Sequence, residues 1–349
     1  LELKPFATMA DSGVDVVMVA HVHAPDYQPE ADDPATLSPF WVTDVLKDRL
    51  GFDGAIITDG MGMGGITKNY SDDYAIVKAV QAGCHIIIQN YDMVGSIDAI
   101  EKAVLDGEIS EQQINSSALK MLELKYKVGL NLNPYVGLDL MMRNISTKRN
   151  REASNRIASE AITLVKDSKG LLPINASPKD TLYIIDIYDQ EYKHSRSTVA
   201  SKIISERIPV RAIQVDESDK KPILDVIVKS IPKNSQILIN AFVSPKEWKD
   251  RIFFPDNETY FVRELIKKSD RIILASLGTP YLLQDFPKVS TYICAYNGSY
   301  LMQNALANAL LGSKAISGRL PISIPGLYEI GSGMFKETKI KVEKISEYK

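Results

Sequence analysis

The chain has 349 residues, of which 45% are hydrophobic and 24% are charged, and its formal net charge is −3. This composition is typical of a globular protein of about two domains, and the near-neutral charge without a long Lys/Arg stripe argues against a nucleic-acid-binding protein. No run of about 18 apolar residues is present, so no membrane span is expected. The only two cysteines, Cys84 and Cys294, lie in apolar runs and are expected to be buried free thiols.

The first 130 residues alternate between helical and strand-like segments. A helix is predicted to end at Ser12, where Gly13 can cap it. Short apolar runs bounded by glycine or polar residues predict three buried parallel strands, over residues 14–21, 55–57 and 84–89. Helices are predicted between and after these strands, over residues 39–50, 71–82, 96–105 and 110–126, the last opening with a capping box at Ser110. This order is typical of a parallel α/β layer.

Asp59 stands at the carboxyl end of the predicted strand at residues 55–57. In α/β barrels and open α/β sheets this edge is where chemistry takes place, although an aspartate there can also merely cap the next turn. The glycine-rich segment at residues 60–65 lacks the spacing of a P-loop or a dinucleotide fingerprint. No nucleotide cofactor is therefore expected, and the glycines instead allow the backbone and a ligand to approach closely.

The other polar residues at this edge are His21, His23 and the pair Tyr91-Asp92. Two histidines at i and i+2 can form half of a metal site, but no third ligand is evident, so no metal is expected. Tyr91 and Asp92 follow the third strand and are candidates to contact a substrate. His85 begins that strand at the opposite end and is expected to be structural.

The second half of the chain repeats the alternation after a polar, irregular stretch at residues 131–148, which is predicted to be a linker. Apolar residues at helical spacing predict a helix over residues 149–167. Strands are then predicted over residues 181–187, 210–215, 236–241, 271–276 and 291–295, with helices near residues 199–207, 223–230, 260–269 and 299–311. This pattern predicts a second α/β domain with a mostly parallel sheet over residues 149–334 and a Lys-rich tail or linker over 335–349.

Several ordered motifs resemble glycoside hydrolase family 3, and most closely its β-N-acetylglucosaminidase branch. They are PATLS at 34–38, TDVL at 43–46, LGFDGAIITD at 50–59, GLLPI at 170–174, LGTPYLL at 277–283 and SGRLPISIP at 317–325. The resemblance extends to about residue 334. One departure follows Asp59, because the family usually has Asp, Ala or Trp where this chain has Gly60.

The resemblance implies that residues 1–130 are the last three strand–helix units of a TIM-type barrel and that residues 149–334 form an α/β sandwich domain. It implies that Asp59 is the nucleophile of a retaining glycosidase that removes terminal β-N-acetylglucosamine, from cell-wall-derived or related glycans. It also places His21 and Met63 beside the sugar, with a core position as the alternative for each. Asp92 is a candidate to contact the substrate from its position at the active edge alone. No cofactor is implied.

The general acid/base separates the branches of the family. In the β-glucosidase branch it is a second-domain Glu in a Gly-Glu-rich segment, which the region around residues 243–248 lacks, so Glu247 is expected to be a surface residue. In the N-acetylglucosaminidase branch it is a His paired with an Asp, which would lie upstream of Leu1. The chain is therefore expected to need a missing N-terminal barrel segment as its partner.

Two alternatives stay open at this point. One is a β-glucosidase or β-xylosidase of the same family, and the other is a non-catalytic carbohydrate-binding or scaffolding remnant. The oligomeric state is open, as is the compartment, for which an extracytoplasmic location, periplasmic or secreted, is favoured.

Overall fold

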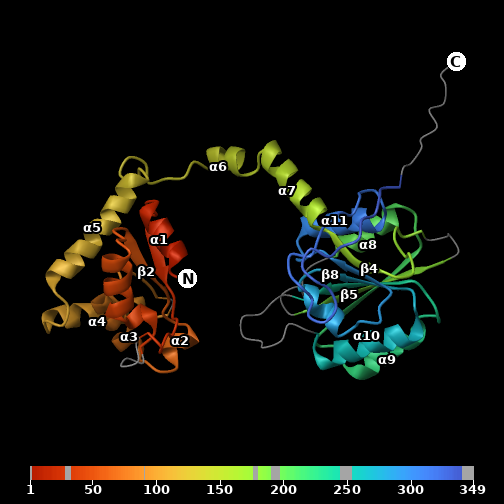
Figure 1. Cartoon of the computed structure of the whole chain (residues 1–349), viewed down its shortest axis with the longest axis horizontal. Coiled ribbons are helices and arrows are strands. Elements are labelled where there is room, and N and C mark those ends of the chain that lie inside the picture. The colour runs from red at the N-terminus through yellow and green to blue at the C-terminus, as the bar shows by residue number, and fades with distance from the viewer. Residues whose placement is uncertain are drawn as a thin grey trace, which may run out of the picture. The chain divides into compact units, whose positions relative to one another are not determined.

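The computed structural model describes residues 2–27, 33–89, 91–175, 180–189, 197–243 and 254–339, without the side chain of Met142. The chain divides into two compact units, Leu1–Leu138 and Asp139–Lys349 (Figure 1). Each unit consists of helices around a sheet whose strands are all or mostly parallel, which confirms the predicted α/β class.

The first unit contains a three-stranded parallel sheet in the order β1-β2-β3. Val19 of β1 pairs with Thr58 of β2, and Gly60 of β2 pairs with Ile88 of β3, so the three strands end at one edge. The elements of this unit are α1 (Lys4–Asp11), β1 (Val16–Val19), η1 (Ala35–Leu37), η2 (Phe40–Arg49), β2 (Ala55–Gly60), α2 (Gly64–Thr67), α3 (Asp72–Ala82), β3 (Ile86–Ile88), α4 (Met93–Leu105) and α5 (Glu111–Lys127).

Local sequence signals explain where several of these helices begin and end. Helix α3 ends at Gly83, whose φ of 111° is accessible to glycine and strained for other residues. Helix α5 begins as predicted, because the Ser110 hydroxyl accepts a hydrogen bond from the Gln113 N–H at 3.2 Å. The ten residues of η2 have π-helical geometry and bury Val42, Val45 and Leu46.

The two faces of the β1-β2-β3 sheet differ. Val17 and Ile56, which pair across β1 and β2, both pack into the apolar cluster beneath the helices. Successive side chains alternate between faces, so Met18 and its partner Ile57 lie on the other face. There Met18 is 51% exposed, and the same alternation places Asp59 on this open face.

The second unit contains a six-stranded sheet in the order β4-β9-β8-β7-β5-β6, parallel throughout except for the antiparallel pair β4 and β9. Its elements are α6 (Leu138–Ile145), α7 (Lys148–Ala161), β4 (Thr163–Asp167), β5 (Leu182–Tyr188), α8 (Thr198–Ser205), β6 (Val210–Asp216), α9 (Lys221–Ser230), β7 (Ile237–Phe242), α10 (Asp256–Lys268), β8 (Ile272–Ser276), η3 (Pro280–Gln284), β9 (Thr291–Cys294) and α11 (Tyr300–Leu310). The five strands predicted after residue 180 and the four helices between and after them are confirmed, with ends that shift by a few residues.

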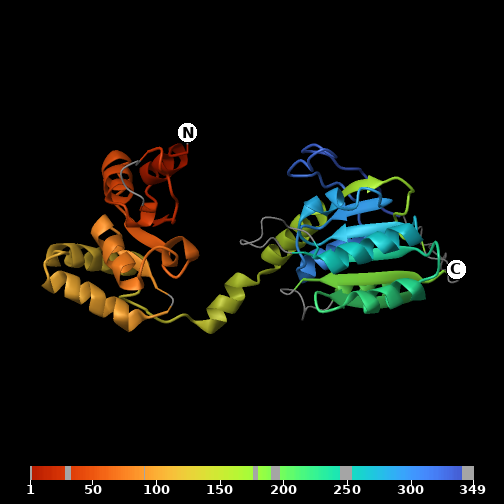
Figure 2. The same ribbon diagram turned by 90° about the horizontal axis from the view of Figure 1, so that it is seen from below.

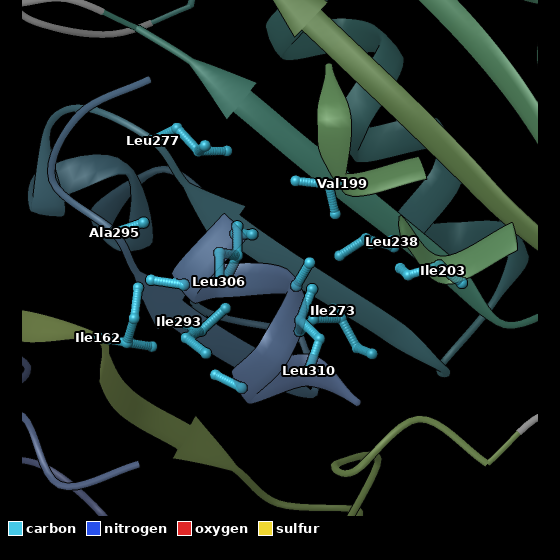
Figure 3. Packing of buried hydrophobic residues seen from close by; sticks show 14 of the residues in the cluster. Ile162, Val199, Ile203, Leu238, Ile273, Leu277, Ile293, Ala295, Leu306 and Leu310 are labelled. Carbon is cyan, nitrogen blue, oxygen red and sulfur yellow. The ribbon is translucent and has the colours of Figure 1, made fainter. Parts of the chain in front are cut away.

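This unit has three layers. Helices α8 and α11 cover one face of the sheet, and α9 and α10 lie next to each other on the opposite face (Figures 1 and 2). Figure 3 shows Leu306 and Leu310 of α11 packed against Ile273 and Ile293 of the sheet, within the first of two large apolar clusters. The neighbouring residue Leu274 points the other way, into the second cluster with α10.

Three details differ from the sequence predictions. The helix predicted over residues 149–167 ends at Ala161, and Thr163–Asp167 instead forms β4, which pairs with β9. Residues 131–148 are not irregular throughout, because they contain α6. Lys336, placed in the tail, exchanges backbone hydrogen bonds with Ile316. Its ammonium group also lies 3.2 Å from the buried Asp167 carboxylate, as an ion pair without hydrogen-bond alignment.

Candidate active site

The candidate site lies at the carboxyl edge of the β1-β2-β3 sheet. His21 follows β1 by two residues, Asp59 is the last residue but one of β2, and Tyr91 follows β3 by three residues. Backbone and side-chain contacts join these positions through the glycine-rich segment that begins at Gly60. The structure therefore assembles one site from residues that the sequence placed at three separate strand ends.

Asp59 has one engaged and one free carboxylate oxygen within the described part of the chain. Its Oδ1 accepts a hydrogen bond from the Gly60 N–H at 2.7 Å, and no described residue donates to Oδ2. The side chain is partly exposed. Asp59 does not cap the following helix α2, whose N-cap is Met63 and has no side-chain capping bond. The carboxylate is thus available to a ligand.

His21 has both ring nitrogens bonded within the protein. Its Nε2 lies 3.0 Å from the Gly60 carbonyl oxygen, and its Nδ1 lies 2.9 Å from the Thr36 hydroxyl. Thr36 is fully buried and its hydroxyl also lies 3.1 Å from the Val19 carbonyl oxygen. Thr36 was only part of a motif in the sequence, and nothing in that motif indicated that its side chain would join β1 to this histidine.

The segment after Asp59 brings Met63 and Tyr91 to the same edge. The Met63 N–H donates to the Gly60 carbonyl at 3.0 Å, and the Met63 side chain is partly buried. The Tyr91 ring lies so close to Gly62 that a Cβ at position 62 would stand 2.2 Å from a ring carbon. A side chain at residue 62 would therefore have to displace the exposed Tyr91 ring.

Asp92 caps helix α4. Its Oδ1 accepts a hydrogen bond from the Gly95 N–H at 2.9 Å, and its side chain is exposed. The carboxylate therefore has a structural function at the N-terminus of a helix, and its contact with a substrate stays a prediction. The same holds for Met63.

The remaining titratable groups of interest are structural. The His85 Nδ1 accepts a hydrogen bond from the Ile56 N–H at 2.9 Å, and burial together with the nearby Lys47 and Lys120 lowers the pKa of His85 to about 4. Cys84 and Cys294 are buried free thiols, as predicted, and burial raises the pKa of each to about 12. Both thiols are thus protonated and unreactive at neutral pH.

Within the described ranges, no group of three or more His, Cys, Asp or Glu side chains is arranged to hold a metal ion. Among the same residues, no helix has the length and apolar character needed to cross a membrane. Glu247 lies outside the described residues, so its expected surface position stays a prediction.

Comparison with known proteins identifies relatives for both units. Residues 1–124 match the family model for the "Glycosyl hydrolase family 3 N terminal domain". The chain is 21% identical over 338 residues to a "Beta-N-acetylglucosaminidase/beta-glucosidase" of Cellulomonas fimi, which covers 89% of this chain and 58% of that protein. It is 31% identical over 134 residues to a "Beta-hexosaminidase" of Psychromonas ingrahamii, which covers 38% of each protein.

The solved structure of a glycoside hydrolase family 3 β-N-acetylglucosaminidase from Paenibacillus sp. str. FPU-7 is also similar. It shares 26% sequence identity with this chain at a TM-score of 0.74, and the match covers 91% of this chain and 60% of that one. The chain thus spans less than two thirds of the length of each of these three relatives.

Proposed function

Since this chain belongs to glycoside hydrolase family 3, we propose that the whole protein is a retaining glycosidase that removes terminal β-N-acetylglucosamine. The observation that carries this proposal is Asp59, a partly exposed carboxylate at the carboxyl edge of a parallel sheet with an unengaged Oδ2. The names of the Cellulomonas fimi, Psychromonas ingrahamii and Paenibacillus relatives support the choice of an N-acetylhexosaminide substrate. Cell-wall-derived glycans are the proposed source of that sugar.

In the proposed reaction, an oxygen of Asp59 attacks the anomeric carbon while the glycosidic bond breaks and the leaving oxygen takes a proton. Water then attacks the same carbon from the opposite side and gives its proton to the group that had protonated the leaving oxygen, while the bond to Asp59 breaks and the carboxylate is released. Two inversions therefore give net retention. The Gly60 N–H, which donates to Oδ1, stabilises the ionised carboxylate before attack and after release. A His–Asp pair upstream of Leu1 is the expected proton donor to the leaving oxygen.

The test is to replace Asp59 by Ala in the full-length protein and to measure release of a chromogenic leaving group from an N-acetylglucosaminide. We expect a loss of several powers of ten in kcat, because a covalent nucleophile is removed, with an unchanged melting temperature. Asp53→Asn is the matched control, because Asp53 precedes the same strand at its other end and its side chain is 98% exposed. Near-normal turnover by Asp59→Ala would overturn the proposal.

A β-glucosidase is the second candidate, because the name of the Cellulomonas fimi relative includes both activities. The discriminating measurement is the ratio of kcat/KM for the N-acetylglucosaminide to kcat/KM for the corresponding glucoside and xyloside. We expect kcat/KM for the N-acetylglucosaminide to exceed that for the glucoside and that for the xyloside. A higher kcat/KM for the glucoside would reassign the substrate, and no turnover of any of the three would favour a non-catalytic remnant.

A further inference from the structure

We infer that His21 is a positioning residue, which holds the Gly60 carbonyl and thereby the peptide next to the Asp59 carboxylate, rather than a ligand of the sugar. The inference rests on the proposed role of Asp59. It changes the expectation from the sequence, which placed His21 beside the substrate.

Hydrogen-bond accounting fixes the protonation of the Nε2 atom of His21. The Gly60 carbonyl oxygen can only accept, so Nε2 must carry the hydrogen that bridges their 3.0 Å separation. The Thr36 hydroxyl has one hydrogen and two acceptors within reach, the Val19 carbonyl and the His21 Nδ1. The hydroxyl can donate to only one of these two acceptors, and neither choice changes the hydrogen that Nε2 needs. In both states Nε2–H points at Gly60.

The bond matters because Gly60 is the residue that contacts Asp59 most directly. Its N–H donates to Asp59 Oδ1 at 2.7 Å, while its carbonyl accepts from His21 and from the Met63 N–H. A glycine has more backbone freedom than any other residue, so its conformation must be fixed by its neighbours. His21 is the only side chain among the described residues that donates to this carbonyl. The carbonyl belongs to the Gly60–Met61 peptide, whose N–H also donates to the Ile88 carbonyl at 2.9 Å. Loss of the His21 bond therefore removes the one side-chain restraint on this peptide, and we expect the adjoining Gly60 N–H that donates to Asp59 to be less firmly held.

The surroundings of His21 favour a fixed ring. Gly60 is buried and Thr36 is fully buried, so the two bonds of the ring are shielded from water. Helix α2 packs closely beside it, since a Cβ added at Gly65 would stand 3.1 Å from the His21 Cβ. A ring that is held by two protein partners has no nitrogen left for a sugar hydroxyl.

The kinetic test uses two substitutions in the full-length protein. His21→Phe keeps a flat ring and removes the donor, and we expect kcat to fall about 10–100-fold with KM within about 3-fold, as for a misplaced catalytic group. The Gln side chain can place its amide nitrogen near the Nε2 position, so His21→Gln should recover at least part of the lost kcat. Asp53→Asn is again the control, because Asp53 lies before β2 at the end opposite to Asp59 and its side chain is 98% exposed. A raised KM with unchanged kcat in His21→Phe would overturn the inference.

A second readout is independent of activity. In ¹⁵N-histidine-labelled full-length protein, the His21 Nε2 should give the nitrogen shift of a protonated site at pH 8, and this signal should persist in the inactive Asp59→Ala variant. An unprotonated Nε2 would overturn the inference even if His21→Phe failed to fold. If Asp59→Ala is active while the Nε2 signal is as expected, the proposed function fails and the hydrogen bond stands.

Discussion

The two units bury their sheets to different extents. In the second unit every residue of β5, β7, β8 and β9 is buried, and helices cover both faces. In the first unit β1 exposes Val16 and Met18, and no residue of β3 is fully buried. Parallel sheets are normally covered on both faces. The described residues cover both faces of the sheet in the second unit, but in the first unit they leave one face open.

Two strand aspartates show what this difference means. Asp186 of β5 is 2% exposed, and its Oδ1 accepts a hydrogen bond from the Asn240 amide at 2.7 Å. Asp59 of β2 is partly exposed on the open face of its sheet and keeps one oxygen free of described donors. Burial in the covered sheet makes Asp186 costly to ionise, whereas Asp59 is partly exposed among the described residues. Coverage of the sheet, and not the residue type, separates the two.

The largest effect should come from the core of the second unit. Phe261 of α10 is 0% exposed, and Phe261→Ala should destabilise this unit by about 3–5 kcal/mol, because it removes buried apolar surface and leaves a cavity. In the 349-residue chain by itself, Met18→Ala on the open face of the first unit should change stability by less than about 0.5 kcal/mol. Hydrogen exchange with peptide resolution, recorded at increasing denaturant concentration, measures the free energy of unfolding of each unit separately. A loss of similar size for Met18→Ala would show that the open face is covered in solution.

A smaller effect should come from Asp186, with a defined pH dependence. Burial raises the pKa of Asp186 from its ordinary value of 3.8 to about 6. The folded state therefore binds this proton more tightly, so the contribution of Asp186 to stability is complete below pH 3.8 and is lost as the pH rises through about 6.

Replacing this aspartate by an uncharged amide tests that dependence. Asp186→Asn should stabilise the second unit by about 1–3 kcal/mol at pH 7.5 and have little effect at pH 3.8. The measurement is the free energy of unfolding of both proteins at the two pH values. An equal effect at both would show that ionisation of Asp186 is not the cause.

The smallest effect should come from His85, and its dependence on pH is opposite to that of Asp186. The folded pKa of about 4 lies below the ordinary 6.5, so the contribution of His85 is present above pH 6.5 and is lost as the pH falls through about 4. Acidification should therefore cost the first unit about 1–2 kcal/mol, after allowance for screening by solvent at a partly exposed ring.

His85→Asn removes the titration and retains an oxygen near the Nδ1 position to accept from Ile56. We expect this variant to have a flatter dependence of stability on pH between 6.5 and 4 than the unmodified protein. A histidine titration by NMR with a midpoint above pH 6 would contradict the assignment. Together, Asp186 and His85 predict that mild acid favours the second unit and weakens the first.

Much of the fold was predictable from local sequence signals. The apolar run at residues 272–275 is bounded by Arg271 and Ser276. Ser110 and Gly83 mark helix ends with hydrogen bonds or backbone angles that depend on neighbours in sequence. The prediction of a helix over residues 149–167 was wrong after Ala161, because the residues there fit both the spacing of a helix and the alternation of a strand. Thr163 and Val165 are β-branched, and the pairing of residues 163–167 with β9, which is far along the chain, favours a strand.

The same distinction between local and distant determinants applies to the candidate site. The sequence by itself determined that Asp59, His21 and Asp92 stand at strand ends, because the alternation of strands and helices follows from local sequence patterns. Only the tertiary structure decided that His21 has no free ring nitrogen, since Thr36 and Gly60 lie 15 and 39 residues away from it. It also decided that Asp59 faces the open side of its sheet. Hydrogen-bond partners and coverage of a sheet depend on segments that are distant in sequence, so no local sequence pattern predicts which of these segments come into contact.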